Sequence, residues 1–311
     1  MKDILTKAIT KDGFFKISAV TSTGIVNKAH EYHKTMPAAT AALGRLLTAD
    51  LLMAAELKEQ AAGITLQLRG DGPLGTLVAV ADSSGGVKGY VANPAADLPL
   101  RADGKIDVGG AVGKGTLSVI RDLKMKEPYI GQIPIQTGEI GDDLAYYFMQ
   151  SEQIPSVVAL GVLVDRDYTA KCAGGFLIQV MPGCDDKSLT KLENSVNGLM
   201  SVTEMIDKGM DSSEIIKYVM LGFDTEILES VPVEYRCGCS RERMERAIIS
   251  LGKKEISDII EEQGEAEIIC QFCNTPYRFD KDELSAMEAR AVRKWLNKMT
   301  ENARKPKNNY V

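Results

Sequence analysis

Two closely spaced cysteine pairs constrain the fold of this chain more than any other feature of its sequence. Cys237 and Cys239 are separated by one residue, and Cys270 and Cys273 are separated by two. Pairs of this kind bring thiolates together, and four cysteine sulfurs are a ligand set typical of a structural zinc site. We therefore expect one Zn2+ ion per chain with these four ligands, although the 30 residues between the pairs exceed the gap of a simple zinc ribbon.

The sequence around the pairs predicts a small α+β domain over residues 232–311. Ser240 can cap a helix that Gly252 ends, the strand Ala266–Ile269 leads into the second pair, and a last helix reaches Trp295. Because a unit of this size buries a small core, a metal-binding free energy of about 10 to 16 kcal/mol can decide whether it folds. Each pair could also close a local disulfide after oxidation, which permits a redox switch without requiring one.

Residues 1–182 predict a mixed domain of α-helices and antiparallel sheets, so the whole chain belongs to the α+β class. Helical periodicity covers residues 27–57, where Pro37 must start or kink a segment, and a further helix is expected over 143–153. Short strand patterns separated by turn residues indicate antiparallel meanders. The expected strands are 14–23, 64–68, 76–81, 87–92, 116–121, 157–164 and 176–180.

Two other motifs suggest binding sites, and we interpret both as ordinary structure. In the glycine-rich run 109–116, the first glycine of a phosphate-binding loop would have to stand where Val108 is, and a strand follows instead of a helix. We interpret this run as a hairpin turn. His30 and His33 have no third ligand nearby and are interpreted as surface residues.

Residues 183–231 predict a helical linker region. Ser201 with Glu204 and Asp211 with Glu214 match the spacing of capping boxes at the start of short helices. Helices of two or three turns are marginal in water, so this region must gain its stability from something it packs against. The region is rich in methionine, which suits either an irregular core or an adaptable apolar surface.

The composition describes an ordinary globular protein, with 44% apolar residues, 26% charged residues and a formal net charge of −6. The longest apolar run, 157–164, is far shorter than the ~18 residues of a membrane span. The first ten residues carry Lys2, Asp3 and Lys7 and lack an export signal. We expect a cytoplasmic protein without a membrane partner. No catalytic Ser, His and Asp set or carboxylate pair stands out, so we expect no enzymatic activity.

Two alternatives from other classes use similar cysteine pairs. A zinc module that binds nucleic acid should be basic, yet residues 231–311 carry 15 Lys plus Arg and 14 Asp plus Glu, a balance of +1, and the rest carries 22 − 29 = −7. Arg241, Arg243 and Arg246 alternate with acidic residues, as on a solvated helix face. We expect no nucleic-acid partner. A thiol oxidoreductase would use the second pair for turnover, and an insulin-reduction assay would reveal it.

The residues around the cysteines also resemble a known family. The run Glu-Tyr-Arg-Cys-Gly-Cys-Ser-Arg-Glu-Arg at 234–243, with Cys270-Gln-Phe-Cys273-Asn and Tyr277-Arg-Phe, is similar to the redox-regulated thirty-three-kilodalton heat-shock chaperones of bacteria. Arg-Gly-Asp-Gly-Pro at 69–73 resembles a strand turn in the N-terminal domain of that family. The resemblance spans the chain.

The resemblance implies an ATP-independent holdase that is inactive while its four cysteines hold zinc. Oxidation would form the disulfides Cys237–Cys239 and Cys270–Cys273, release zinc and unfold the linker. The exposed apolar surface would bind unfolding proteins and prevent their aggregation under oxidative stress. The implied partners are unfolded or oxidatively damaged clients, a second copy of the chain in an oxidised homodimer, and an ATP-dependent foldase chaperone downstream.

The two remaining cysteines have no place in this pattern. We interpret Cys172 and Cys184 as a buried small hydrophobe and an incidental thiol. Within the linker, the apolar residues of the short helices are candidates for client binding or for a regulatory interface. These candidates are Leu199, Met200, Met205, Ile206, Ile215, Ile216, Val219 and Met220.

Overall fold

The computed structural model describes residues 2–57, 59, 62–125 and 127–304, with the segment 294–304 described by its backbone only. It divides into two compact units, Met1–Cys237 and Gly238–Val311, which we describe separately. Residues 305–311 of the expected C-terminal domain lie outside the described residues. The expected three-part division at 182 and 231 stays a prediction.

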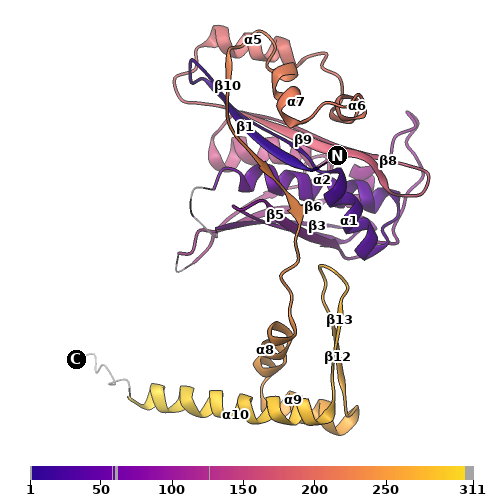
Figure 1. Cartoon of the computed structure of the whole chain (residues 1–311), viewed down its shortest axis with the longest axis vertical. Coiled ribbons are helices and arrows are strands. Elements are labelled where there is room, and N and C mark those ends of the chain that lie inside the picture. The colour runs from indigo at the N-terminus through magenta and orange to yellow at the C-terminus, as the bar shows by residue number, and fades with distance from the viewer. Residues whose placement is uncertain (1, 58, 60–61, 126, 305–311) are drawn as a thin grey trace. The chain divides into compact units, whose positions relative to one another are not determined.

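The first unit contains two sheets whose strands are mostly antiparallel (Figure 1). The five-stranded sheet has the order β10-β1-β2-β9-β8. Its strands are β1 (Ile4–Thr10), β2 (Phe15–Thr21), β8 (Ser156–Val164), β9 (Ala170–Val180) and β10 (Thr225–Pro232). The six-stranded sheet has the order β11-β5-β4-β3-β6-β7, and only the short β11 pairs in parallel among its described strands. Its strands are β3 (Gly63–Gly70), β4 (Thr76–Asp82), β5 (Gly86–Val91), β6 (Gly115–Asp122), β7 (Tyr129–Pro134) and β11 (Glu234–Tyr235).

Helix α2 (Pro37–Ala54) lies between the two sheets and is buried nearly all round (Figure 1). Its sequence is apolar on every side, as expected of a helix enclosed by a core. Pro37 occupies the first turn, where its missing N–H costs no hydrogen bond, so the expected role of this proline as a helix start is confirmed. Helix α1 (Thr23–His33) packs against α2.

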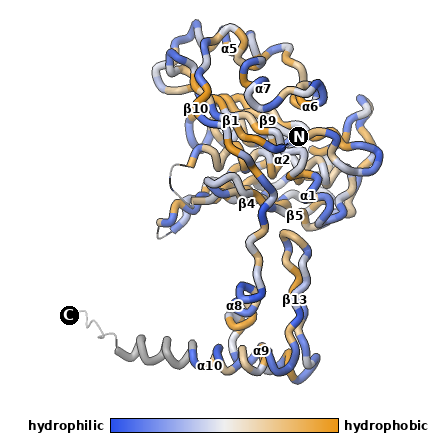
Figure 2. Tube along the Cα trace, in the orientation of Figure 1, coloured by the Kyte–Doolittle hydropathy of each residue, from blue (hydrophilic) through white to orange (hydrophobic). Residues whose placement is uncertain are grey.

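The opposite face of the five-stranded sheet carries three short helices, α5 (Asp186–Val196), α6 (Val202–Asp207) and α7 (Ser212–Val219). Their apolar residues and those of the sheet form a second core, and hydrophobic residues gather along β1 and β9 (Figure 2). Ser201 and Asp211 form the expected capping boxes with Glu204 and Glu214, so those predictions are confirmed. These helices gain their burial from the sheet.

The helical character expected for residues 183–231 is wrong at the end of that region, because residues 225–232 form strand β10. Most side chains of β10 are exposed, so its sequence lacks the alternation that would reveal a strand. The strand forms because its backbone pairs with β1, from Ile4 opposite Pro232 to Thr10 opposite Thr225. Strands β1 and β7 were also not expected.

The expected helix over 143–153 is observed as α4 (Gly141–Tyr147) followed by a single turn of π-helix, η1 (Phe148–Glu152). The expected strands of the first unit are confirmed within two residues of their ends, except that β9 begins six residues before the expected strand 176–180. The interpretation of His33 as a surface residue is wrong, because α1 turns it inward. Its Nε2 atom lies 3.0 Å from the carbonyl oxygen of Gly89 in β5.

The second unit is a small α+β fold, and the expected fold class is confirmed for the chain. Its elements are α8 (Arg241–Leu251), α9 (Lys253–Glu262), β12 (Ala266–Ile269), β13 (Pro276–Phe279) and α10 (Lys281–Arg304). Ser240 caps α8 and Gly252 ends it, as expected. The core is small: its described buried residues are Ile248, Ile256, Phe279, Leu284, Met287 and Ala291.

Candidate metal centre

The structure brings the four predicted metal ligands together. The Sγ atoms of Cys237, Cys239, Cys270 and Cys273 all lie within 4.8 Å of one another. The second pair is buried and the first pair is half-buried. The first pair stands between β11 and α8, and the second pair occupies the turn between β12 and β13.

The donor set fits a zinc ion. Zn–S bonds of about 2.3 Å in a tetrahedron place the sulfur atoms about 3.8 Å apart, and the sulfurs of Cys239 and Cys273 are 3.4 Å apart. Four thiolates at this spacing would repel one another without a cation among them. Soft sulfur donors in this number favour Zn2+ over Mg2+ or Ca2+, which prefer oxygen. When bound, zinc would supply the positive charge that keeps these sulfurs as thiolates.

Backbone hydrogen bonds shape the turn that carries the second pair. The N–H of Asn274 donates to the carbonyl of Cys270 at 2.8 Å, and the N–H of Cys270 donates to the carbonyl of Thr275 at 3.0 Å. Asn274 has a φ of 54°, in the left-handed region that asparagine tolerates better than most residues. The pairing of Ile269 with Pro276 closes the hairpin behind the turn.

Two arginines that follow the first cysteine pair form hydrogen bonds with the backbone near the cysteines. The Arg243 guanidinium donates to the carbonyl of Gly238, between the two cysteines, at 2.8 Å. The Arg241 guanidinium donates to the carbonyl of Arg278 at 2.8 Å, forms an ion pair with Glu283 and lies over the ring of Phe279. Arg243 and Arg246 are exposed, as expected of a solvated helix face, and Arg241 is half-buried. The sequence positions of Arg241 and Arg243 gave no sign of these contacts, because Gly238 lies before α8 and Arg278 lies in β13.

Two hydroxyl groups contact the sulfurs, and sequence reasoning did not single them out. The hydroxyl of Tyr277 donates to Sγ of Cys239 at 3.1 Å. The Oγ1 atom of Thr275 lies 3.2 Å from Sγ of Cys273. The hydrogen bond to Cys239 is the main cause that raises the pKa of Tyr277 to about 12, so its hydroxyl keeps its proton at neutral pH.

The chain that leads into the first cysteine is fixed in the first unit. The N–H of Arg236 donates to the carbonyl of Val87 in β5 at 2.8 Å. The guanidinium of Arg236 forms an ion pair with Asp82 at 3.0 Å. Strands β10 and β11 precede Arg236. The first candidate ligand, Cys237, therefore comes directly after the last residue that is hydrogen-bonded to β5.

The structure places the candidate client-binding residues against the five-stranded sheet. Leu199 and Met200 are half-buried against the second core. The other six lie within that core and are buried: Met205, Ile206, Ile215, Ile216, Val219 and Met220. Their proposed role therefore requires the helices to leave the sheet, and it stays a prediction.

The remaining cysteines lie outside the metal centre. Cys172 is buried in β9, and its thiol donates to the carbonyl of Thr203 in α6 at 3.3 Å. Cys184 is half-buried in the loop before α5. Burial raises the pKa of both thiols, which keeps them protonated and poorly nucleophilic.

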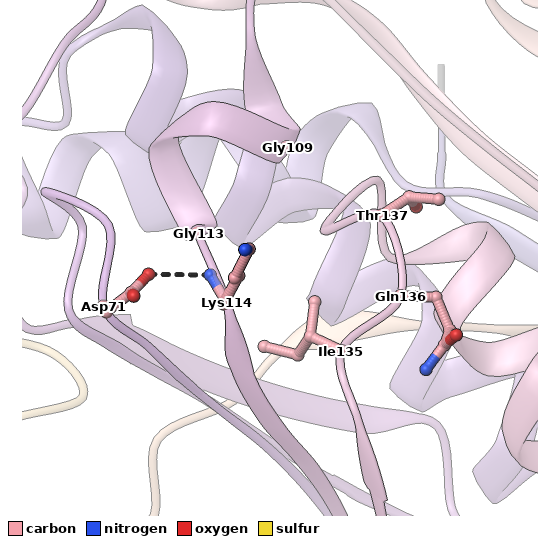
Figure 3. Close-up of a pocket in the computed structure, with 7 residues that line it drawn as sticks. All are labelled: Asp71, Gly109, Gly113, Lys114, Ile135, Gln136 and Thr137. Carbon is pink, nitrogen blue, oxygen red and sulfur yellow. Dashed lines mark hydrogen bonds between the residues drawn. The ribbon is translucent and has the colours of Figure 1, made fainter.

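The glycine-rich run does not form the expected hairpin turn. Residues 108–112 form the short helix α3 (Val108–Val112), because the Asp107 carboxylate accepts from the N–H of Gly110 at 2.9 Å. The run then borders a hollow of about 420 Å³, where the N–H of Lys114 donates to the Asp71 carboxylate at 2.7 Å (Figure 3). None of the residues predicted to form a functional site lines this hollow.

Among the residues that the structure describes, no helix combines the length and the apolar character needed to cross a membrane. Some of the charged side chains in the second unit form ion pairs with one another. Ion pairs join Arg241 to Glu283 and Arg290 to Glu245. Such pairing leaves these cations poorly placed to bind phosphates.

Together, the fold and the four clustered cysteines define an α+β protein whose small second unit carries a candidate metal site. Comparison with known proteins then identifies its family. The model of the Hsp33 protein family matches residues 3–280, and the chain belongs to that family. The resemblance found in the sequence is therefore confirmed.

Relatives of this family match nearly the whole chain. The 33 kDa chaperonin of Clostridium botulinum strain 657 is 50% identical over 285 residues, which are 91% of this chain and 96% of the relative. The 33 kDa chaperonin of Clostridium acetobutylicum is 47% identical over 289 residues, 92% of this chain and 97% of the relative. The crystal structure of the 33 kDa chaperonin from Thermotoga maritima is 35% identical, with a TM-score of 0.87, covering 94% of this chain and 99% of that one.

Proposed function

We propose that this protein is a redox-regulated, ATP-independent holdase of the cytoplasm. In its reduced form four thiolates hold Zn2+ and the chaperone is inactive. In its oxidised form it binds unfolding proteins and prevents their aggregation, without enzymatic turnover. The observation that carries this proposal is the gathering of four sulfur atoms within 4.8 Å in a member of the Hsp33 family.

The second unit has few other sources of stability. Its described core is a single small cluster around Ile256, Phe279 and Leu284. A structural zinc site contributes about 10 to 16 kcal/mol, which exceeds the net stability of most small domains. Loss of the metal ligands should therefore unfold this unit.

Peroxide oxidation would remove the ligands in two steps for each cysteine pair. A thiolate attacks one peroxide oxygen, the O–O bond breaks, and a sulfenic acid and a hydroxide ion form. The second thiolate attacks the sulfenic sulfur, forms the disulfide and expels another hydroxide. Two protons convert the hydroxides to water, so each pair loses two electrons to one peroxide. The proposed products, as the resemblance implies, are the disulfides Cys237–Cys239 and Cys270–Cys273.

Unfolding of the second unit can reach the helices through the continuous chain. Strand β10 lies at the edge of its sheet, with most of its side chains exposed, so backbone pairing with β1 is its main support. Thr6 of β1 links β10 to α7: its hydroxyl lies 3.0 Å from that of Ser230 and 2.7 Å from that of Ser212. Loss of β10 would weaken the packing of α7.

Release of α6 and α7 would expose the apolar residues that now contact the sheet. Methionine-rich surfaces repack against varied partners, which suits the binding of unfolded or oxidatively damaged clients. The same exposed surface would favour pairing of two oxidised copies as a homodimer. A holdase without ATP turnover also requires an ATP-dependent foldase to receive its clients.

A client aggregation assay tests this function. The reduced, zinc-loaded protein should not suppress the aggregation of a heat-denatured client, whereas the peroxide-treated protein should suppress it at near-stoichiometric amounts. The variant Cys237→Ser with Cys270→Ser should lose tight zinc binding. The matched control, Cys172→Ser with Cys184→Ser, should bind zinc and respond to peroxide like the unchanged protein.

Equal suppression by the reduced and oxidised forms would contradict the proposed regulation. Catalytic reduction of insulin disulfides by the reduced protein, without aggregation suppression, would instead show a thiol oxidoreductase.

A further inference from the structure

The hydroxyl groups of Tyr277 and Thr275 contact one sulfur from each cysteine pair. The two contacted sulfurs, those of Cys239 and Cys273, are themselves neighbours at 3.4 Å. A zinc-bound thiolate carries no proton, so a hydroxyl beside it must be the donor. Both contacts therefore become charge-assisted hydrogen bonds in the reduced, metal-bound state.

A hydrogen bond of this kind withdraws electron density from the sulfur. The thiolate lone pair is the nucleophile that attacks peroxide, so a donor on that sulfur slows the attack. Groups that contact ligand atoms also hold those atoms in the orientation that the metal needs, and their loss costs about 10- to 100-fold in metal affinity or activity.

We propose that Tyr277 and Thr275 are positioning residues that set the peroxide threshold of the metal centre. Tyr277 protects Cys239 and Thr275 protects Cys273, so the first oxidation of either pair is slower than the cysteine spacing alone would give. This inference rests on the proposed redox function and adds the groups that tune it.

The local fold explains why these hydroxyls stay in place. Tyr277 lies in β13 opposite Ile268, and its ring packs against the core of the second unit. The carbonyl of Thr275 accepts the N–H of Cys270 at 3.0 Å, which fixes the backbone of Thr275 within the turn. Both donors are therefore held by contacts that do not involve the hydroxyls.

The test measures zinc release from the full-length, reduced protein at several peroxide concentrations with a metallochromic indicator. The slope of the release rate against peroxide reports the attack on sulfur, and the intercept reports spontaneous loss of zinc. Tyr277→Phe should raise the slope about three- to tenfold, as expected for the loss of one hydrogen bond. Thr275→Val should also raise the slope, whereas Thr275→Ser, which keeps the hydroxyl, should have the same slope as the unchanged protein.

A spectroscopic measurement gives an independent reading. In the Co2+-loaded protein, Tyr277→Phe should shift the sulfur-to-metal charge-transfer band to lower energy, because the sulfur becomes more electron-rich. Tyr129→Phe, the same change on exposed β7, should leave both the band and the release slope unchanged.

A purely structural role of Tyr277 would raise the intercept and leave the slope within twofold of the unchanged protein, and that result would overturn the inference. If Tyr277→Phe does not bind zinc, the slopes of Thr275→Val and Thr275→Ser test the inference instead, and equal slopes would overturn it. If the unchanged protein binds no zinc, the proposed function itself fails. If it binds and releases zinc normally but the variant slopes match, only this inference fails.

Discussion

At the scale of single residues, buried polar side chains mark the points where this protein is easiest to perturb. Thr6 is buried, and its hydroxyl contacts a buried serine of α7 and an exposed serine of β10. Asp50 lies within α2 in the main core, and both of its carboxyl oxygens lack a hydrogen-bond partner in the structure. Neither residue was singled out by sequence, because a polar residue in an apolar pattern does not reveal its partners.

Replacing Thr6 with valine should loosen the helices. The change leaves the buried hydroxyl of Ser212 without this partner, which costs about 1 to 3 kcal/mol. We expect faster amide exchange in α7 and β10, measured by hydrogen exchange with mass spectrometry. Thr6→Ser keeps the hydroxyl and should restore most of the protection; unchanged exchange in Thr6→Val would refute the proposed link.

Asp50 should make stability depend on pH. Burial raises the pKa of this carboxyl well above its usual value, against a smaller opposing effect of the Ala81 backbone. Above the ordinary carboxyl pKa of ~3.9, the folded state then binds more protons than the unfolded state, so stability falls as pH rises toward the raised pKa. The slope approaches about 1.4 kcal/mol per pH unit within that window.

Asp50→Asn should flatten this dependence and gain stability relative to the unchanged protein as pH rises. The free energy of unfolding is measured in urea at several pH values, with hydrogen exchange of α2 peptides as the probe of unfolding. Glu193→Gln, at an exposed carboxylate of α5, serves as the control and should keep the original slope. Parallel curves for Asp50→Asn and the unchanged protein would exclude a buried, titrating Asp50.

The gathering of the four cysteines was predictable from their spacing, because two short cysteine pairs are typical of a four-sulfur metal site. The side chains that form hydrogen bonds around these cysteines were harder to predict. Arg243 reaches Gly238 and Tyr277 reaches Cys239 only after α8 and β13 have taken their places in the folded unit. Such contacts depend on tertiary geometry, which no local pattern encodes.

At the scale of helices and strands, the sequence predicted the elements that have capping residues or a regular apolar pattern. Capping residues and apolar periodicity revealed α6, α7 and α8. Strand β10 was missed because its side chains are mostly exposed and its stability comes from pairing with β1, which lies more than 200 residues away in the sequence. Segments whose structure depends on a distant partner are also those most easily released when that partner changes.

Ile216→Ala should release α7 from the sheet in the reduced protein. Ile216 is fully buried in the second core, and truncation of such a residue costs about 2 to 5 kcal/mol. We expect increased exchange in α7 and partial aggregation suppression without oxidant. Lys217→Ala, at the exposed neighbouring position, should behave like the unchanged protein. Full protection of α7 in Ile216→Ala would argue against the packing role of this residue.

At the scale of the whole molecule, two units of unequal robustness share one chain. The first unit encloses α2 between two sheets and has a large core, whereas the second unit has a small one. Larger cores bury a greater share of their surface and need no metal. The metal should therefore matter to one unit far more than to the other.

Chelation of zinc from the reduced protein should unfold the second unit selectively. Amides of β12 and β13 should lose protection, while amides of β3 in the first unit keep theirs. Addition of zinc under reducing conditions should restore the original pattern. Hydrogen exchange measures both regions in one sample, and equal protection of β12 and β13 with and without metal would contradict a structural role for the ion.

In the mechanism that we propose, oxidation of the four thiolates releases the metal and thereby activates the chaperone. The most direct measurement follows zinc release and suppression of client aggregation together after peroxide is added to the reduced protein at elevated temperature. We expect one zinc ion per chain to be released, with activity appearing at the same time as release or after it. Activity that appears while zinc stays bound, or a reduced protein that contains no metal, would contradict the account.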